Sequence, residues 1–157
     1  MRIQLKIGDT APEIRAKDQQ GHSFSLLKYL GKKVIIYFYP KDSTPGCTAE
    51  SCDLRDNYVY LQKQGFEVIG ISTDSQKSHL KFIEKYKLPF LLISDTDKLV
   101  VNDYGVYGQK KFLGKSYMGI FRTTFIIDEK GKIEEIITNV ETKNHSKQII
   151  ETVTNKG

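Results

Sequence analysis

The chain contains two cysteines, Cys47 and Cys52, and the position of the first predicts a reactive thiol. The apolar run 34–39 ends at Pro40, and a polar turn closed by a Pro-Gly pair follows. Helical periodicity begins at Cys47, so we expect a strand, a tight turn and a helix with a thiol in its first turn. Unpaired N–H groups and a partial positive charge at a helix start favour the thiolate, which is the reactive form of cysteine.

A helix start is not sufficient to activate a thiol, which predicts that a second cation takes part. It stabilises a negative charge by about 0.3–1 kcal/mol and at best about 2 kcal/mol. Lowering a thiol pKa from about 8.5 to about 6 requires roughly 3.4 kcal/mol. Arg122, at the start of a predicted strand, is the candidate because arginine keeps its charge where water is scarce. The alternative is a surface or salt-bridged arginine, which is the common role of this residue.

The five-residue spacing of the cysteines limits how they can react with each other. In a regular helix their Cα atoms would lie roughly 8.7 Å apart, with the side chains about 140° apart around the axis. A disulfide tolerates about 7 Å at most. A bond between Cys47 and Cys52 therefore requires the first turns of the helix to unwind. The alternative is that both cysteines are small buried hydrophobic residues.

The composition describes an ordinary globular chain of 157 residues, 39% hydrophobic and 27% charged, from which we expect one domain over 1–157. The net charge is +5, but the basic residues are dispersed and do not alternate with aromatic ones, which argues against nucleic-acid binding. The N-terminus has no leader-like segment, and no apolar run reaches the about 20 residues of a membrane span. We therefore expect no membrane association and a reducing, cytoplasmic location.

Apolar runs and helical spacing predict strands that alternate with helices. A short hairpin within 13–27 and a helical turn over 26–30 come first, and the later strands are expected at 34–39, 66–72, 90–94, 122–128 and 132–138. Helices are expected from Cys47 to a stop at Gly65, from a cap at 73–75 to Tyr86, over 95–104, and from a cap at Asn144 through Val153. This order predicts one α/β domain and is consistent with a thioredoxin-like fold, that is, a central mixed sheet flanked by helices with an N-terminal β-hairpin extension.

Helical spacing predicts which side chains of two helices face the core, and one segment shows no pattern of regular structure. The inward side chains are predicted to be Leu80, Phe82, Ile83 and Tyr86 in one helix and Leu99, Val100 and Tyr104 in the next. Residues 105–119 are rich in glycine, tyrosine and lysine without a clear period. They are therefore predicted to form a long surface loop.

Pro40, Thr44 and Cys47 form the pattern P-x-x-x-T-x-x-C, which resembles the active-site signature of peroxiredoxins. The surrounding TPGCTAESCDLRD is similar to the Q-type branch, the bacterioferritin comigratory proteins, in which a second cysteine follows five residues later. The similarity continues into 70–74 and 119–122 and covers nearly the whole chain.

The resemblance implies a role for each signature residue. Cys47 would attack a peroxide, and Arg122 would stabilise both the thiolate and the charge that develops during attack. Thr44 would hold a peroxide oxygen in line with the sulfur, although it is also a typical turn residue that bonds its own backbone. Pro40 would shield the thiolate. From its spacing alone, three residues after Cys47, Glu50 could orient Arg122, but a solvated helix glutamate is nearly as good an interpretation, so Glu50 is not counted among the catalytic residues.

The same resemblance implies a complete peroxidase cycle. Cys52 would condense with the Cys47 sulfenic acid, and thioredoxin, or glutaredoxin as a substitute, would reduce the disulfide. The substrates would be hydrogen peroxide and organic hydroperoxides, and the protein would be a monomer. No metal, flavin or haem cofactor is expected, because sulfur carries the redox chemistry.

Two other functions remain open at this stage. A redox sensor would use the same disulfide to melt the helix and change a partner interface. A disulfide reductase or isomerase would act on protein thiols, although the chain has no C-x-x-C motif. Two further motifs are rejected: the segment 114–116 lacks the earlier glycine of a P-loop, and the three histidines are too dispersed for zinc-site spacing.

Overall fold

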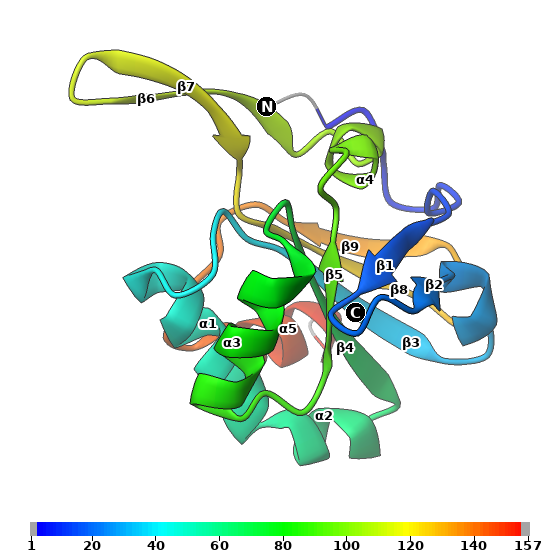
Figure 1. Ribbon diagram of the computed structural model, residues 1–157. Helices are drawn as coiled ribbons and strands as arrows, with labels where there is room; N and C mark the ends of the chain where they lie inside the picture. The colour runs from blue at the N-terminus through cyan, green and yellow to red at the C-terminus, as the bar shows by residue number, and fades with distance from the viewer. Residues whose placement is uncertain (1–2, 155–157) are drawn as a thin grey trace.

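A seven-stranded mixed β-sheet runs through the centre of the computed structural model, which describes residues 3–154 (Figure 1). Its strands lie in the order β2-β1-β5-β4-β3-β8-β9. Their bounds are β1 Ala16–Asp18, β2 Ser23–Phe24, β3 Lys33–Phe38, β4 Phe66–Ser72, β5 Leu91–Ser94, β8 Thr123–Ile127 and β9 Ile133–Ile137. Strands β3, β4 and β5 are parallel, and the other pairings are antiparallel. The predicted mixed sheet and N-terminal hairpin are present, and the hairpin strands are short.

Helices cover both faces of this sheet, in the thioredoxin-like arrangement that the sequence predicts. Side chains from α1, α2, α3 and α5 pack into one buried cluster on one face. Side chains from α4 and a 3-10 turn pack into the cluster on the other face. The bounds are Leu26–Tyr29 for the 3-10 turn, α1 Pro45–Asp56, α2 Tyr58–Lys63, α3 Gln76–Tyr86, α4 Leu99–Asp103 and α5 His145–Thr154.

Strand β3 divides the core in two because side chains alternate across a strand. The even-numbered side chains of 34–38 belong to the α4 cluster, and the odd-numbered side chains of 35–39 belong to the other one. All of them are buried, which explains a strand that is apolar throughout. Burial of each such side chain contributes about 1.5–3 kcal/mol. Cys47 packs in the same cluster as Tyr37 and Tyr39.

The predicted loop over 105–119 is wrong, because this segment forms a separate two-stranded hairpin. Strands β6 Tyr107–Phe112 and β7 Lys115–Ile120 pair antiparallel. Leu113 and Gly114, with φ of 52° and 77°, make the two-residue turn between them. The hairpin projects from the rest of the molecule (Figure 1). Most of its side chains are partly or fully exposed, so no apolar alternation marked the strands in the sequence.

Two of the predicted helices also differ from the structure. The helix expected from Cys47 to Gly65 is divided at Asn57 into α1 and α2, and it begins two residues earlier than expected, at Pro45. The helix expected over 95–104 is shorter and covers only α4, and the Asp95 carboxylate accepts the backbone N–H groups of Val100 and Val101 in its first turn. Leu80 and Leu99, both predicted to face inward, are 46% and 62% exposed.

Across the described residues 3–154, no helix combines the length and the apolar character needed to cross a membrane.

Candidate active site

Cys47 lies in the first turn of α1 and is fully buried. Thr44 occupies the N-cap position and Pro45 the first helical position, where proline has the backbone angle that a helix needs. The sulfur therefore lies near the positive end of the helix dipole. Both cysteines are free thiols, and α1 is continuous through Cys52.

Arg122 reaches the sulfur from the segment that leads into β8. Its Nη2 donates to Cys47 Sγ at 3.3 Å, and its Nη1 donates to Glu50 Oε1 at 2.7 Å. One guanidinium group thus bridges the thiol and a carboxylate one helical turn away. The two residues that sequence reasoning paired, Cys47 and Arg122, are in contact, and Glu50 orients the arginine instead of facing solvent.

Gly46 makes room for this guanidinium group. A Cβ atom at position 46 would lie 3.0 Å from Nη2 of Arg122, which is closer than ordinary van der Waals contact allows. A side chain here would push the arginine away from the sulfur. Sequence reasoning treated this glycine only as part of a turn, because its close neighbour is 76 residues away in the chain.

The charges at the site influence one another strongly. Burial lowers the pKa of Arg122, but the negative charges and hydrogen bonds of Cys47 and Glu50 outweigh burial and raise it. Arg122 therefore stays a cation. Burial raises the pKa of Glu50 to about 7, although the arginine charge and hydrogen bond oppose this. The carboxyl group that holds Arg122 is therefore close to its midpoint at neutral pH.

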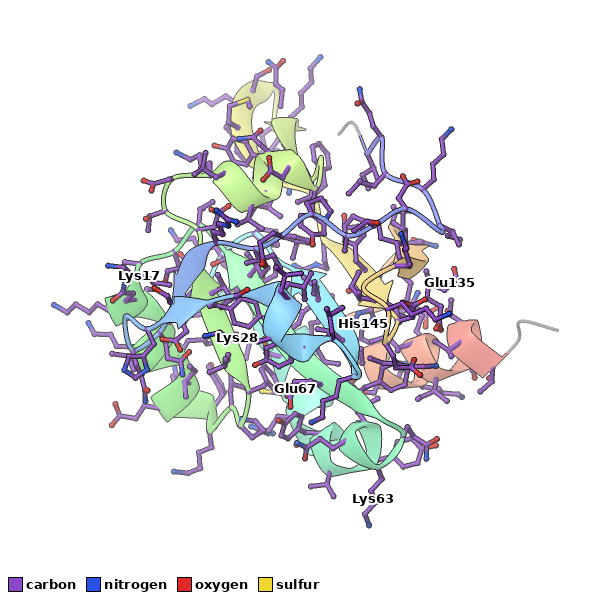
Figure 2. All side chains as sticks on the ribbon, turned by 90° about the vertical axis from the view of Figure 1, so that its right-hand side faces the viewer. Lys17, Lys28, Lys63, Glu67, Glu135 and His145 are labelled. Atoms are coloured by element: carbon purple, nitrogen blue, oxygen red, sulfur yellow. The ribbon has the colours of Figure 1, made fainter. Side chains whose placement is uncertain are left out.

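A second buried layer lies behind Glu50, and sequence reasoning missed it. Nε2 of His145, the first residue of α5, lies 3.5 Å from Glu50 Oε2 and 2.7 Å from the Thr124 hydroxyl. His145 lies inside the molecule, whereas Lys63 points outward from α2 (Figure 2). A single histidine after a helix cap carries no sequence signal for such a contact, which arises only when α5 packs against α1.

Thr44 and Pro40 lie in the loop between β3 and α1. The Thr44 hydroxyl donates to the carbonyl of Lys41 at 2.8 Å, as a turn residue does. Its oxygen lone pairs can still accept a hydrogen bond from a hydroperoxide. Pro40 is half-buried directly after β3. The catalytic role of Thr44 and the shielding role of Pro40 remain predictions.

A network of buried hydrogen bonds anchors the loop between β3 and α1. The Asp42 carboxylate accepts hydrogen bonds from the hydroxyls of Tyr39 and Ser78 and lies 2.7 Å from Nδ1 of His79. The backbone N–H of Asp42 donates to the carboxylate of Asp74, at the end of β4. These contacts hold the loop where Ser43 adopts a positive φ of 63°, which is unusual for a residue other than glycine.

One of the three histidines, His79, lies in a group of side chains that could hold a metal ion. Ligand atoms of Asp42, Asp74 and His79 all lie within 4.8 Å of one another. Within the described part of the chain, each of these residues is hydrogen-bonded inside the network, and Nε2 of His79 faces the carbonyl of Ile93 at 3.0 Å. The group is therefore satisfied as a structural anchor.

The hairpin contributes a second cation near the thiol. Lys110 Nζ donates to the carbonyl of Ile120 at 2.9 Å and lies over the ring of Phe121. Burial lowers the pKa of Lys110, the charge of Arg122 lowers it further, and the charge of Cys47 opposes both. Sequence reasoning overlooked Lys110 because the segment was taken for a loop.

Cys52 lies on the same helix as Cys47, and its neighbour Asp53 is tied to α5. The backbone N–H of Ser146 donates to Asp53 Oδ2 at 2.7 Å, and the Ser146 hydroxyl donates to the Asp53 carbonyl at 3.3 Å. With regular helix geometry the two cysteines remain roughly 8.7 Å apart between Cα atoms. Unwinding α1 through Cys52 would disturb these contacts.

The chain is similar to known proteins both in sequence and in fold. Residues 7–136 match the model of the AhpC/TSA family. Peroxiredoxin Bcp of Escherichia coli strain K12 is 48% identical over 141 residues, with 90% of each chain covered, and that of Bacillus subtilis strain 168 is 42% identical over 151 residues, with 96% of each covered. A solved structure of the Xanthomonas campestris bacterioferritin comigratory protein, described for its alkyl peroxide reduction activity, superposes with a TM-score of 0.88 at 29% identity and covers 100% of this chain and 99% of that one. The predicted fold class is thereby confirmed.

Proposed function

Because the chain belongs to the AhpC/TSA family, within the peroxiredoxins, we propose that it reduces hydrogen peroxide and organic hydroperoxides through Cys47, Cys52 and thioredoxin. Family membership establishes the broader activity, that of a thiol peroxidase. The observation that carries the finer proposal is the 3.3 Å hydrogen bond from Arg122 to the Cys47 sulfur at a helix N-terminus.

In the first step the Cys47 thiolate attacks the terminal oxygen of the hydroperoxide. A sulfur–oxygen bond forms, the O–O bond breaks, and the leaving oxygen takes a proton to become water or an alcohol. Cys47 becomes a sulfenic acid. Arg122 is placed to stabilise the thiolate and the departing negative charge, because Glu50 holds its guanidinium group against the sulfur.

In the second step the Cys52 sulfur attacks the oxidised Cys47 sulfur and displaces water, which leaves a disulfide. This step needs local unwinding of α1, because the helical separation of roughly 8.7 Å exceeds what a disulfide spans. The contacts of Asp53 with Ser146 and Asn57 must then loosen.

A dithiol reductant completes the cycle by disulfide exchange, and thioredoxin is our proposed partner, with glutaredoxin as a substitute. The alkyl peroxide activity of the Xanthomonas relative supports organic hydroperoxides as substrates. We further propose that the protein acts as a monomer in the cytoplasm, as part of antioxidant defence.

Stopped-flow mixing of the reduced protein with hydrogen peroxide, followed by mass analysis of the cysteines, tests this proposal. Rapid loss of two hydrogens, mapped to one Cys47–Cys52 bond, and repeated turnover with thioredoxin are expected. The Cys52→Ser variant should complete the first oxidation and then accumulate sulfenic or overoxidised Cys47, while Cys47→Ser should show no reaction. Oxidation no faster than that of an ordinary thiol would contradict the proposal, and a single oxidation without turnover would favour a redox sensor.

A further inference from the structure

One carboxylate oxygen at the site is buried without a hydrogen bond. Oε1 of Glu50 accepts from Arg122, whereas Oε2 is fully buried and has no hydrogen-bond partner. Nε2 of His145, which can exchange a proton with this oxygen, lies 3.5 Å away and is also fully buried. An unsatisfied buried carboxylate oxygen is energetically unfavourable, so the histidine next to it needs an explanation.

The hydrogen bonds around His145 determine which ring nitrogen carries a proton. Gln148 Oε1 accepts a backbone N–H from Glu141, and the amide nitrogen of Gln148 donates to the carbonyl of Asn139, so the oxygen is the atom that faces His145. Nδ1 of His145, 2.9 Å from that oxygen, must therefore be its donor. In the neutral ring Nε2 then carries no proton and has one lone pair, and the Thr124 hydroxyl, 2.7 Å away, can rotate toward it or away from it.

Two acceptors thus face each other inside the protein, Oε2 of Glu50 and Nε2 of His145. One proton placed on either atom would turn this unfavourable contact into a hydrogen bond, provided that the Thr124 hydroxyl is rotated away from the Nε2 lone pair. We propose that His145 is a positioning residue that shares one proton with Glu50. The presence of this proton determines how strongly Arg122 stabilises the Cys47 thiolate. This inference deepens the proposed function, on which its importance for peroxide reduction rests.

Charge balance links the proton to the thiol. With Glu50 ionised, the Arg122 cation interacts with both the carboxylate and the sulfur. If Cys47 is then a thiolate, the three groups Arg122, Glu50 and Cys47 together carry one excess negative charge. With the proton on the pair, the arginine and the thiolate balance each other. Ionisation of Cys47 therefore promotes proton binding by the pair, and loss of that proton opposes the thiolate.

The groups that act on the pair come from four segments of the chain. Arg122 and Thr124 face it from the β8 segment, Asp53 from α1, Gln148 from α5, and the neutral Tyr37 hydroxyl from β3. Burial raises the pKa of Glu50 to about 7, with Arg122 opposing and Asp53 adding to the rise. Burial lowers the pKa of His145 to about 4, with Gln148 and Asp53 opposing and Arg122 lowering it further. The proton therefore resides mainly on Glu50 and points toward the imidazole.

Two substitutions at His145 should move the thiol in opposite directions. In His145→Gln the new amide can donate to Oε2 permanently, which keeps Glu50 ionised, so Cys47 should ionise at higher pH. In His145→Leu the apolar side chain keeps Glu50 neutral to higher pH, so Cys47 should ionise at lower pH. Each displacement should be about 1 pH unit. Loss of packing alone would not produce shifts of opposite sign.

The measurement is the ultraviolet absorbance of the thiolate as a function of pH in the Cys52→Ser background, in which a single thiol titrates. His22→Gln, at an exposed histidine, is the matched control and should leave the midpoint unchanged. Thiolate titration needs no peroxide, so a protein without peroxidase activity would still show these displacements. Midpoints that do not move, or that move in the same direction, would overturn the inference.

A second measurement keeps His145 unsubstituted and is therefore independent of how well the His145 variants fold. Nitrogen-15 NMR of the ring should show a protonated Nδ1 and an Nε2 signal that changes as Glu50 releases the shared proton near neutral pH. In Cys47→Ser that transition should move to lower pH, because the negative charge that favours the shared proton is gone. An Nε2 signal that is insensitive to Cys47 would refute the coupling.

Discussion

Two buried histidine–carboxylate contacts involve carboxylates on either side of Cys47 in the chain, Asp42 and Glu50, and they differ in how completely their hydrogen bonds are satisfied. In the Asp42–His79 pair the two atoms are 2.7 Å apart, and Asp42 also accepts from Tyr39 and Ser78. In the Glu50–His145 pair they are 3.5 Å apart, and one carboxylate oxygen has no hydrogen-bond partner. The Asp42–His79 pair is saturated, because its carboxylate has several hydrogen-bond partners, and it holds the loop in one conformation. An unsaturated pair can take up or release a proton, and this one adjoins the residue that contacts the sulfur.

The first prediction removes the cation that links Glu50 to the thiol. Arg122→Met should lower the rate constant for Cys47 oxidation by about 10²–10³-fold, because a donor to the developing charge is lost. Stopped-flow oxidation by hydrogen peroxide measures this. Arg15→Met, at an exposed arginine, is the matched control and should react like the parent. A rate within a factor of three of the parent would show that the contact is not catalytic.

The second prediction breaks the saturated pair. Asp42→Asn places an amide opposite the donors that now face a carboxylate, and it should lower the free energy of unfolding by about 2–4 kcal/mol. Urea denaturation provides the value. Asp56→Asn, on the exposed end of α1, should change it by less than about 0.5 kcal/mol. If the two variants were equally stable, the Asp42 network would not be the anchor described above.

The third prediction concerns pH and the unsaturated pair. Burial raises the pKa of Glu50 from 4.5 to about 7, so between these values the folded protein holds a proton that the unfolded chain has released. The stability contributed by Glu50 is therefore fully present below pH 4.5 and is lost as the pH rises toward 7. Glu50→Gln removes this dependence. Relative to the parent, its free energy of unfolding should increase by about 1.4 kcal/mol per pH unit at most between pH 5 and 6.5. Stability curves that stay parallel over this range would contradict the raised pKa.

The fourth and smallest effect tests the space that Arg122 needs. Gly46→Ala puts a Cβ atom 3.0 Å from Nη2, so the arginine must shift by a few tenths of an ångström. The oxidation rate constant should fall by about tenfold, which corresponds to about 1.4 kcal/mol. In the Arg122→Met background the same substitution should have little effect. Equal losses in both backgrounds would mean that Gly46 acts through the helix start instead.

Local patterns were reliable wherever a segment's own residues decide its structure. The apolar strand at 34–39, the turn closed by Pro45 and the helix start with its thiol were all predictable. The β6–β7 hairpin was not, because its strands lie mostly exposed and lack the apolar alternation that marks a strand. Leu80 and Leu99 have the spacing of core residues but lie at the surface, because the neighbouring elements bury His79 and Val101 instead.

The chain by itself determined the chemistry of this protein: a thiol at a helix start, a second cysteine too distant in a regular helix to bond without unwinding, and an arginine available to support the charge. These follow from residue types and short spacings, which local backbone geometry converts directly into structure. Only the tertiary structure decided the environment of that chemistry, with Glu50 turned inward to Arg122, Gly46 leaving room for the guanidinium group, and His145 placed behind the carboxylate. Their partners lie 72 to 95 residues away along the chain, and burial, which shifts their proton affinities, exists only once α1, β8 and α5 have packed together.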